Sequence, residues 1–489
     1  MIRALAAQSA IYAGTTIVQR GAQLATLLVL PLFLTPADYG AVQMIATVAL
    51  LVNWIGFIEI SQAVARYSGG GSATEEHRIY SNTAWWFSVV VALLLLAIGF
   101  VAQGPLAQLI LGDSSYLPVY RLGVVLMVTL PLFYFLQHQL RFEFDPKGYA
   151  LVSIVFAVAT MGASLGLATL VEPAVNGVML GQVIGAACAL LTAVLRMRGL
   201  FRFTFDRAKF RQMVAFSLPL VPAQLALFAT LYASRFIIND IATLHEVGLF
   251  TFATQIAAIT SLATLGINAA ITPLIMAHHE EPSTPPTLAR LFEGFTAVAV
   301  MLCLILGLFA PQLIAAIGNP DYAGAGPLVM ILAPAAMLAQ MYVFMPGIFL
   351  AKKTTHQMAV SIASAVVGVT ANYLLMLRFG IFGAAVGSLL GAATFLFLWI
   401  PLTQRLYRLP IRWRPVGLVV AAGIAVALAG LAEPPVTGLA AETAYKLALI
   451  AAVAMLSVAA GLLPGPRMLV RLAAGEIERR RERGAERGA

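Results

Sequence analysis

Six polar side chains lie inside or at the ends of long apolar stretches, and they are the residues of this chain that could do chemistry. They are Arg20, Gln23, Glu59, Gln224, Arg235 and Asn372. A polar group that is buried without a hydrogen-bond partner is unfavourable by about 2–7 kcal/mol, depending on the reference state. Side chains of these types can bind an anion or the polar groups of a neutral ligand in a hydrated space. We therefore expect them to line a polar, mildly cationic cavity.

Arg20 is the deepest of these charges, because it lies near the middle of the apolar stretch 9–34. An arginine at the centre of a bilayer is unfavourable by about 2.5–3.5 kcal/mol on insertion scales. Its guanidinium suits bidentate binding of a phosphate or carboxylate. Two interpretations stay open: Arg20 faces the cavity and binds an anionic ligand, or it forms an internal ion pair with Glu59 or with another helix.

Glu59 belongs to a polar helix face, since Gln62 and Arg66 follow it at steps of three and four residues. Residues at these steps are neighbours on a helix surface. Glu59 and Arg66 are therefore expected to pair with each other or to clamp the inner end of this span.

A second group of residues is expected to gate the cavity. Arg235 and Asp240 fall where the stretch 212–236 reaches its outer end, so they either gate the outer mouth or anchor the helix among headgroups. Pro219 and Pro222, three residues apart, remove backbone donors and bend helices. We expect these two prolines to shape the cavity wall.

The elements that must position these residues are membrane-spanning helices. The 489 residues are 61% hydrophobic and only 10% charged, whereas soluble domains carry roughly 25% charge. A helix needs about 20 apolar residues to cross a bilayer, and fourteen such segments occur between residues 9 and 464. The gaps between them are too short for a folded extramembrane domain. This excludes a soluble catalytic module, and the chain is not expected to be an enzyme.

Positive charge orients these spans. Lys and Arg are retained in cytoplasmic loops, and 25 of the 30 fall in alternate gaps or in the tail from residue 467. The pattern predicts a multi-pass protein of a plasma membrane with both termini in the cytoplasm. Five basic residues do not fit the alternation: Arg20, Arg121, Arg235, Arg378 and Lys446.

Metal ions, cofactors and nucleic acid are not indicated. The two cysteines, Cys188 and Cys303, lie inside apolar runs, and the six histidines are scattered apart from the neighbours His278 and His279. Adjacent loop residues seldom converge on one ion. The formal charge of +9 belongs to loops that face anionic membrane lipids, so we do not expect a nucleic-acid partner.

An internal repeat divides the chain. Glycines at four-residue steps in the segment 177–185 return in the segment 383–391, and residues 152–154 (VSI) return at 360–362. Two six-helix units in tandem share one orientation, as in many transporters. The predicted organisation is an N-lobe (1–200, spans 1–6), a C-lobe (201–410, spans 7–12), two further spans (411–465) and a basic cytoplasmic tail (466–489). The glycine steps are expected to serve tight helix packing within each unit.

Several local patterns carry a family resemblance. They are residues 34–40 (LTPADYG), 216–222 (FSLPLVP), 234–238 (SRFII) with 247–250 (VGLF), and 379–385 (FGIFGAA). In order and spacing the chain resembles the polysaccharide transporter branch of the MOP exporter superfamily, the flippases of O-antigen, capsule and exopolysaccharide synthesis. One position departs from the family pattern: many members carry Asp-Arg at the end of span 7, and here Ser234 replaces the acid.

The resemblance implies an all-α fold of fourteen helices, with two MATE-like lobes around a central cavity that opens alternately to either side. It implies transport of a polyprenyl-pyrophosphate-linked oligosaccharide across the bacterial inner membrane. The pyrophosphate would then be the anionic ligand of Arg20 in the first of its two interpretations. Glycosyltransferases and a glycan polymerase of the same pathway are the implied partners. Two relatives remain as alternatives: a MATE-like multidrug or cation antiporter, which would use acidic residues inside the lobes, and a peptidoglycan-precursor flippase, which would use several cavity arginines.

Overall fold

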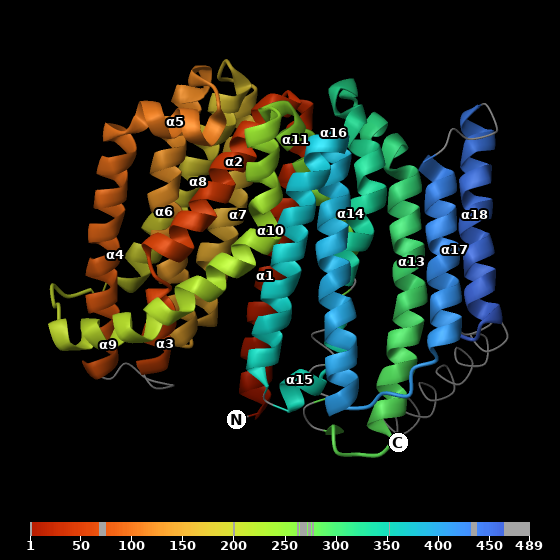
Figure 1. The fold of residues 1–489 in the computed structure, drawn as a ribbon. Coiled ribbons are helices and arrows are strands. Elements are labelled where there is room, and N and C mark those ends of the chain that lie inside the picture. Colours follow the sequence, from red (N-terminus) through yellow and green to blue (C-terminus); the bar gives the residue numbers. More distant parts are fainter. Residues whose placement is uncertain are drawn as a thin grey trace, which may run out of the picture. The chain divides into compact units, whose positions relative to one another are not determined.

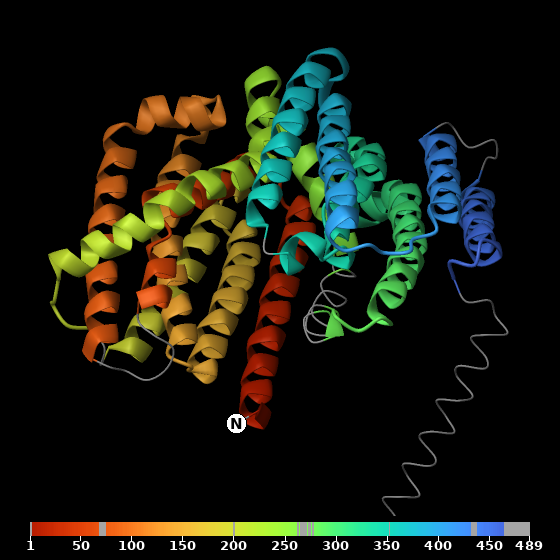
Figure 2. The same cartoon turned by 60° about the horizontal axis from the view of Figure 1, so that its bottom comes forward.

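The structure is a computed structural model that describes residues 2–67, 75–198, 201–261, 264, 271, 275, 278–351, 353–431 and 438–463. In this part of the chain the regular structure is helical and no β-strand occurs, which confirms the all-α prediction (Figures 1 and 2). The predicted basic tail, 466–489, lies outside the described residues.

The described part of the chain contains a series of helices. Their bounds are α1 (Ile2–Val29), α2 (Pro36–Gly56), α3 (Ile60–Tyr67), α4 (Glu75–Val101), α5 (Gln103–Leu111), α6 (Leu117–Phe142), α7 (Pro146–Ala168), α8 (Ala174–Met197), α9 (Arg207–Ser217), α10 (Val221–Ile241), α11 (Leu244–Ala257), α13 (Thr284–Ile317), α14 (Gly326–Leu338), α15 (Gly347–Leu350), α16 (Thr354–Leu406), α17 (Trp413–Leu431) and α18 (Leu439–Ala459). Short 3₁₀ turns η1 (Leu30–Leu32), η2 (Ser114–Tyr116), η3 (Leu218–Leu220), η4 (Pro320–Ala325) and η5 (Met341–Phe344) join some of them.

The protein is a multi-pass membrane protein by the length and composition of its helices. Ten helices of the described part are long and apolar enough to cross a bilayer, or up to eleven if the bent pair Arg207–Leu220 and Gln224–Ile241 forms one span. The outward faces of the helices carry large apolar side chains; Leu93 of α4 and Leu191 of α8, for example, are 60% and 59% exposed. Such surfaces are covered by lipid rather than water.

The chain forms two compact units. Unit 1 comprises Met1–Gln255, Leu313–Ala325 and Ser361–Gly391, and unit 2 comprises Ile256–Gln312, Gly326–Val360 and Ala392–Ala489. Unit 2 is held by contacts such as the ion pair between Arg412 and Glu293, whose nitrogen and oxygen lie 2.6 Å apart. The residues predicted to line or gate the cavity all lie in unit 1.

The repeated glycines pack two helix hairpins of unit 1. Helix α16 is broken at Gly380, which has φ 58° and ψ −145°, a conformation that glycine adopts readily. The chain reverses there, so that Gly387 lies against the backbone of Asn372, where an added Cβ would be 2.5 Å from the Asn372 nitrogen. In the first copy, Gly181 of α8 lies against the backbone of Ser164 in α7 in the same way. The expected role of the glycine steps in tight packing is confirmed.

Gly387→Val is expected to destabilise the protein by about 3 kcal/mol, because the new side chain overpacks a backbone contact that cannot rearrange locally. Thermal unfolding of the purified protein in detergent measures the effect. Gly166→Val is the matched control, since nothing lies within 4 Å of a Cβ at Gly166. Equal melting temperatures for the two variants would show that the hairpin seam is not tightly packed.

Candidate functional site

Arg235 is a buried cation inside unit 1. It lies in α10 with 8% of its surface exposed, and its Nη1 donates a hydrogen bond of 2.6 Å to Oγ1 of Thr47 in α2. The guanidinium also lies over the Tyr232 ring, with Cζ 5.1 Å from the ring centroid. The Thr47 hydroxyl also donates to the Gln43 carbonyl of its own helix. This local bond accounts for a threonine in an apolar helix without any other partner, so nothing in the sequence marks Thr47 as a partner of Arg235. Sequence reasoning therefore missed it.

No carboxylate neutralises Arg235 in the described part of the chain. The ion pairs found there join other residues, and the preceding Ser234 meets Ser388 instead, with their hydroxyl oxygens 3.3 Å apart. Asp240 is exposed on the last turn of α10. A buried charge without a counterion is unfavourable, so Arg235 has the electrostatic character of an anion-binding group.

Glu59 lies in a sharp turn between α2 and α3. Ile58 and Glu59 have positive φ angles of 44° and 51°, which are uncommon for residues with a Cβ and often mark a functional or strained position. The turn interrupts the helix just after Gly56, where α2 ends. It carries the Glu59 side chain toward α10.

Glu59 and Gln224, both predicted from the sequence, are brought together in the structure. Nε2 of Gln224 donates to Oε1 of Glu59 at 3.3 Å, and the Ser217 hydroxyl donates to the Glu59 carbonyl at 3.4 Å. Arg66 instead lies over the Phe216 ring, 4.7 Å from its centroid. Among the described ion pairs none joins Glu59 to Arg66 or to Arg20, so the pairing expected from the helix face is not found.

The polar residues of α1 form a separate group. Arg20 is exposed, Gln23 is half-buried, and Arg20 makes no hydrogen bond or ion pair within the described residues. Its neighbour Gln19 accepts a hydrogen bond of 3.3 Å from Nε2 of Gln137 in α6, which also donates to the Ser153 hydroxyl at 2.7 Å. The Gln19 contact fixes one face of α1 against α6 and leaves the Arg20 guanidinium available.

The remaining predicted residues are Asn372, Pro219 and Pro222. Asn372 is buried in the α16 hairpin, where its Nδ2 donates to the Gly368 carbonyl at 2.9 Å and its Oδ1 has no partner. Pro219 lies in η3 and Pro222 at the start of α10, and both are exposed. They accompany the bend of 46° between the helices Arg207–Leu220 and Gln224–Ile241. The structure thus places the two prolines at a bend, as their spacing predicts.

Two glycines form a seam between α2 and α11. A Cβ at Gly40 would overlap the Leu244 carbonyl, and a Cβ at Gly248 would overlap the Pro36 carbonyl, so the two backbones touch directly. Below them Tyr39, Phe252 and Tyr322 pack edge to face, with ring centroids 5.0–6.1 Å apart. The seam lies at the end of unit 1 opposite to the first residues of α1 (Figure 1). The direct backbone contact joins α2 and α11 closely at this end.

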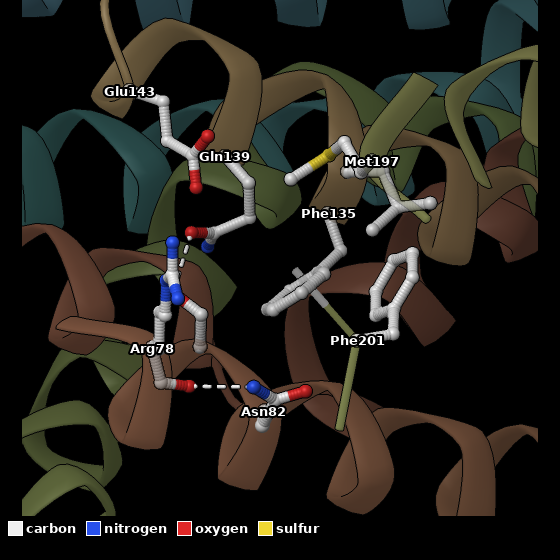
Figure 3. Close-up of a pocket in the computed structure, with 9 residues that line it drawn as sticks. Arg78, Asn82, Phe135, Gln139, Glu143, Met197 and Phe201 are labelled. Carbon is white, nitrogen blue, oxygen red and sulfur yellow. Dashed lines mark hydrogen bonds between the residues drawn. The ribbon is translucent and has the colours of Figure 1, made fainter. Parts of the chain in front are cut away.

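One cavity of unit 1 lies away from all six residues predicted for the cargo site. Its lining includes Arg78, Gln139 and Glu143 together with Phe135 and Phe201 (Figure 3). Its size suits about one water molecule, and Nε of Arg78 and Nε2 of Gln139 face it as donors without a protein partner. A glycan cannot enter a space of this size.

Single and double substitutions can test whether Glu59 and Gln224 act as a pair. In Glu59→Leu and Gln224→Leu we expect the transport rate to fall about tenfold, and the double variant to fall no further, because each single change already breaks the same contact. Glu59→Gln keeps an acceptor oxygen and should retain most of the rate. Independent losses that multiply in the double variant would show that the two side chains act separately.

The sequence matches one protein-family model. The model describes polysaccharide biosynthesis proteins and matches residues 5–262, which is more than half of the chain. The chain belongs to the polysaccharide biosynthesis protein family. The matched region contains α1 to α11 and so includes Arg20, Glu59, Gln224 and Arg235. The resemblance noted from the sequence patterns is confirmed, whereas no curated protein matches the sequence.

Solved structures similar to this family member are transporters. The lipid II flippase MurJ, in an inward closed conformation, has a TM-score of 0.67 at 11% identity, over 92% of this chain and 97% of that chain. A multidrug resistance MATE family transporter of the MOP superfamily, in an inward-facing conformation, has a TM-score of 0.57 at 15% identity, over 81% and 97%. A MOP superfamily transporter from Pyrococcus furiosus has a TM-score of 0.53 at 16% identity, over 82% and 96%. The family member therefore has the fold of MurJ and MATE transporters.

Proposed function

We propose that this protein is a flippase that carries a polyprenyl-pyrophosphate-linked oligosaccharide across the bacterial inner membrane by alternating access. The observation that carries the proposal is Arg235, a buried guanidinium without a carboxylate partner in the described part of a MurJ-like helical bundle. The family match supports a polysaccharide pathway. A fixed buried cation favours an anionic cargo such as a pyrophosphate over a cationic drug.

The polar residues of unit 1 take complementary roles in this proposal. Arg235, oriented by Thr47, and Arg20 bind the pyrophosphate, because guanidinium groups match its oxygens in bidentate geometry. Gln23 and the pair of Glu59 and Gln224 offer hydrogen bonds to sugar hydroxyls, which would otherwise lose water without compensation. Asn372 contributes its unpaired Oδ1 to the same polar lining.

Fourteen spans remain part of the proposal. Helix α16 has 53 residues and breaks at Gly380, so it supplies two antiparallel spans. Helix α1, with 28 residues, is long enough for another, and much of the predicted eighth span lies outside the described residues. The lobes 1–200 and 201–410, the additional pair 411–465 and cytoplasmic termini follow from the sequence repeat and the distribution of positive charge.

The seam between α2 and α11 fits the outer gate of such a transporter. In the proposed orientation it lies at the periplasmic end, close to Asp240. The bend at Pro219 and Pro222 lies at the opposite, cytoplasmic end of the same unit. Opening toward the periplasm would separate Gly40 from Gly248, while the prolines let α10 change its angle.

Reconstitution in proteoliposomes tests the function directly. A polyprenyl-pyrophosphate-linked oligosaccharide is placed in the outer leaflet, and an impermeant lectin measures how fast it disappears from that leaflet. We expect protein-dependent loss, and no protein-dependent movement of the cationic dye ethidium. Ethidium transport with a stationary glycolipid would contradict the proposal and favour the MATE-like antiporter. Preference for a peptidoglycan precursor would favour the other alternative, a peptidoglycan-precursor flippase, which is also compatible with the MurJ-like fold.

A further inference from the structure

A segment between α8 and α10 crosses the first turns of α4 as a strap. The strap comprises residues 201–217, an irregular stretch followed by α9 (Arg207–Ser217). In Figure 1 it lies across the lower end of α4, at the end of unit 1 where α1 begins. The chain bends by 46° where the strap continues into α10. The direction of α9 is therefore different from that of the spanning helix that follows it.

The inner face of the strap is fastened to α4 by its backbone. The Asn82 carboxamide oxygen accepts from the Arg202 nitrogen at 2.8 Å, and the Trp86 indole donates to the Arg202 carbonyl at 3.0 Å. The Asp206 nitrogen donates to the Thr83 hydroxyl at 3.1 Å. Asn82 and Thr83 are 2% and 0% exposed. These buried contacts fix which face of the strap points away from unit 1.

Some basic residues of this region are neutralised by that docking. Lys209 pairs with Glu76 at 2.9 Å, and Arg202 approaches Glu75 at 3.6 Å. Arg196, at the end of α8, pairs with Asp145 at 2.9 Å. Their charge is thus satisfied within unit 1.

The outer face of the strap carries exposed aromatic rings and arginines. Phe203 is 88% exposed although one side of its ring contacts Trp86, and Phe205 is 54% exposed. Arg198, Arg207 and Arg211 are exposed, and none of them has an ion pair or hydrogen bond with another described residue. Phe203, Phe205, Arg207 and Arg211 thus lie close together in the sequence of the strap, and Arg198 lies at the end of α8, just before it.

We propose that this outer face of the strap binds anionic phospholipid headgroups of the leaflet on the side where α1 begins. An element that crosses the end of a spanning helix and carries exposed aromatic and basic side chains suits the boundary between headgroups and acyl chains. The phenylalanines lose contact with water there, and the arginines meet phosphate groups, to which guanidinium binds in bidentate geometry. A lipid without net charge would accommodate the phenylalanines but would not neutralise the arginines. We therefore expect the arginines to favour lipids with a net negative charge.

A lipid-quenching experiment on the full-length chain tests this proposal. The two native cysteines are removed by Cys188→Ser and Cys303→Ala, and a fluorescent maleimide is attached through Ala208→Cys, an exposed position of α9. The protein is placed in phosphatidylcholine nanodiscs that contain, at equal mole fraction, either brominated phosphatidylglycerol or brominated phosphatidylcholine. We expect the anionic quencher to be about three times as effective, because each arginine near the surface attracts anionic lipid. The preference should shrink in high salt.

Matched variants separate the charge from the aromatic anchor. Arg207→Gln with Arg211→Gln should bring the two quenchers to equal effect, whereas Arg121→Gln with Arg378→Gln, two arginines outside the strap, should leave the preference unchanged. Phe203→Ser with Phe205→Ser should weaken quenching by both lipids. Equal quenching of the unaltered strap by both lipids would overturn the proposal. So would a label that neither lipid quenches, which would indicate a face turned to water or to a partner protein.

Discussion

Arg235→Met is expected to reduce transport of the lipid-linked glycan about 100-fold while leaving the protein at least as stable as before. The stability follows because a buried charge without a counterion is unfavourable, and an apolar side chain of similar volume removes that charge from the interior. The loss of transport follows because Arg235 and the pyrophosphate of the cargo would form a buried, hydrogen-bonded charge pair. Removing one partner of such a pair is unfavourable by about 2–5 kcal/mol. The lectin assay in proteoliposomes and thermal unfolding in detergent measure the two quantities on one sample.

Conservative variants sharpen the test of Arg235. Arg235→Lys keeps the charge but loses the planar fork, so an intermediate rate is expected. Thr47→Val removes the hydroxyl that orients the guanidinium 2.6 Å away, and a loss of about tenfold is expected, in line with one hydrogen bond to a charged group. Arg378→Met alters an exposed arginine of the same unit and should have no effect. If Arg235→Met transported normally, Arg235 would be a structural residue and the cargo site would lie elsewhere.

Gly248→Val is expected to have the second-largest effect, because it opens the seam between α2 and α11. The new Cβ would overlap the Pro36 carbonyl, and backbone atoms on both sides cannot move aside separately. Overpacking of this kind is unfavourable by about 1–3 kcal/mol, which would shift the balance between closed and open outer ends by roughly five- to 150-fold. We expect transport to fall by about tenfold or more, since a protein held open at one end cannot complete the cycle.

Thiol labelling reports the position of the seam in the same variant. Ala41 is fully buried beside Gly40, so Ala41→Cys in a background without the native cysteines should react slowly with an impermeant maleimide. Adding Gly248→Val should speed the reaction, whereas Gly162→Val should not, because a Cβ at Gly162 meets nothing within 4 Å. Slow labelling and normal transport in Gly248→Val would show that the seam is not a gate.

The sequence alone determined the kind of molecule this is. Apolar stretches of bilayer length leave the backbone only one way to satisfy its hydrogen bonds, which is the helix. The four-residue glycine steps likewise predicted tight seams, because a glycine row on any helix allows close approach. Gly181 and Gly387 form such seams in both copies. The family resemblance was also visible in local patterns such as residues 34–40.

Only the tertiary structure decided which polar residues meet. Arg235 and Thr47 are 188 positions apart, and Glu59 and Gln224 are 165 apart, so no local periodicity relates them. Glu59 accepts a hydrogen bond from Gln224 of α10, whereas Arg66, which the spacing placed on the same helix face, lies over the Phe216 ring. Local spacing fixes which face of one helix a residue occupies. The packing of separate helices, and the breaks within them, determine which side chain lies opposite.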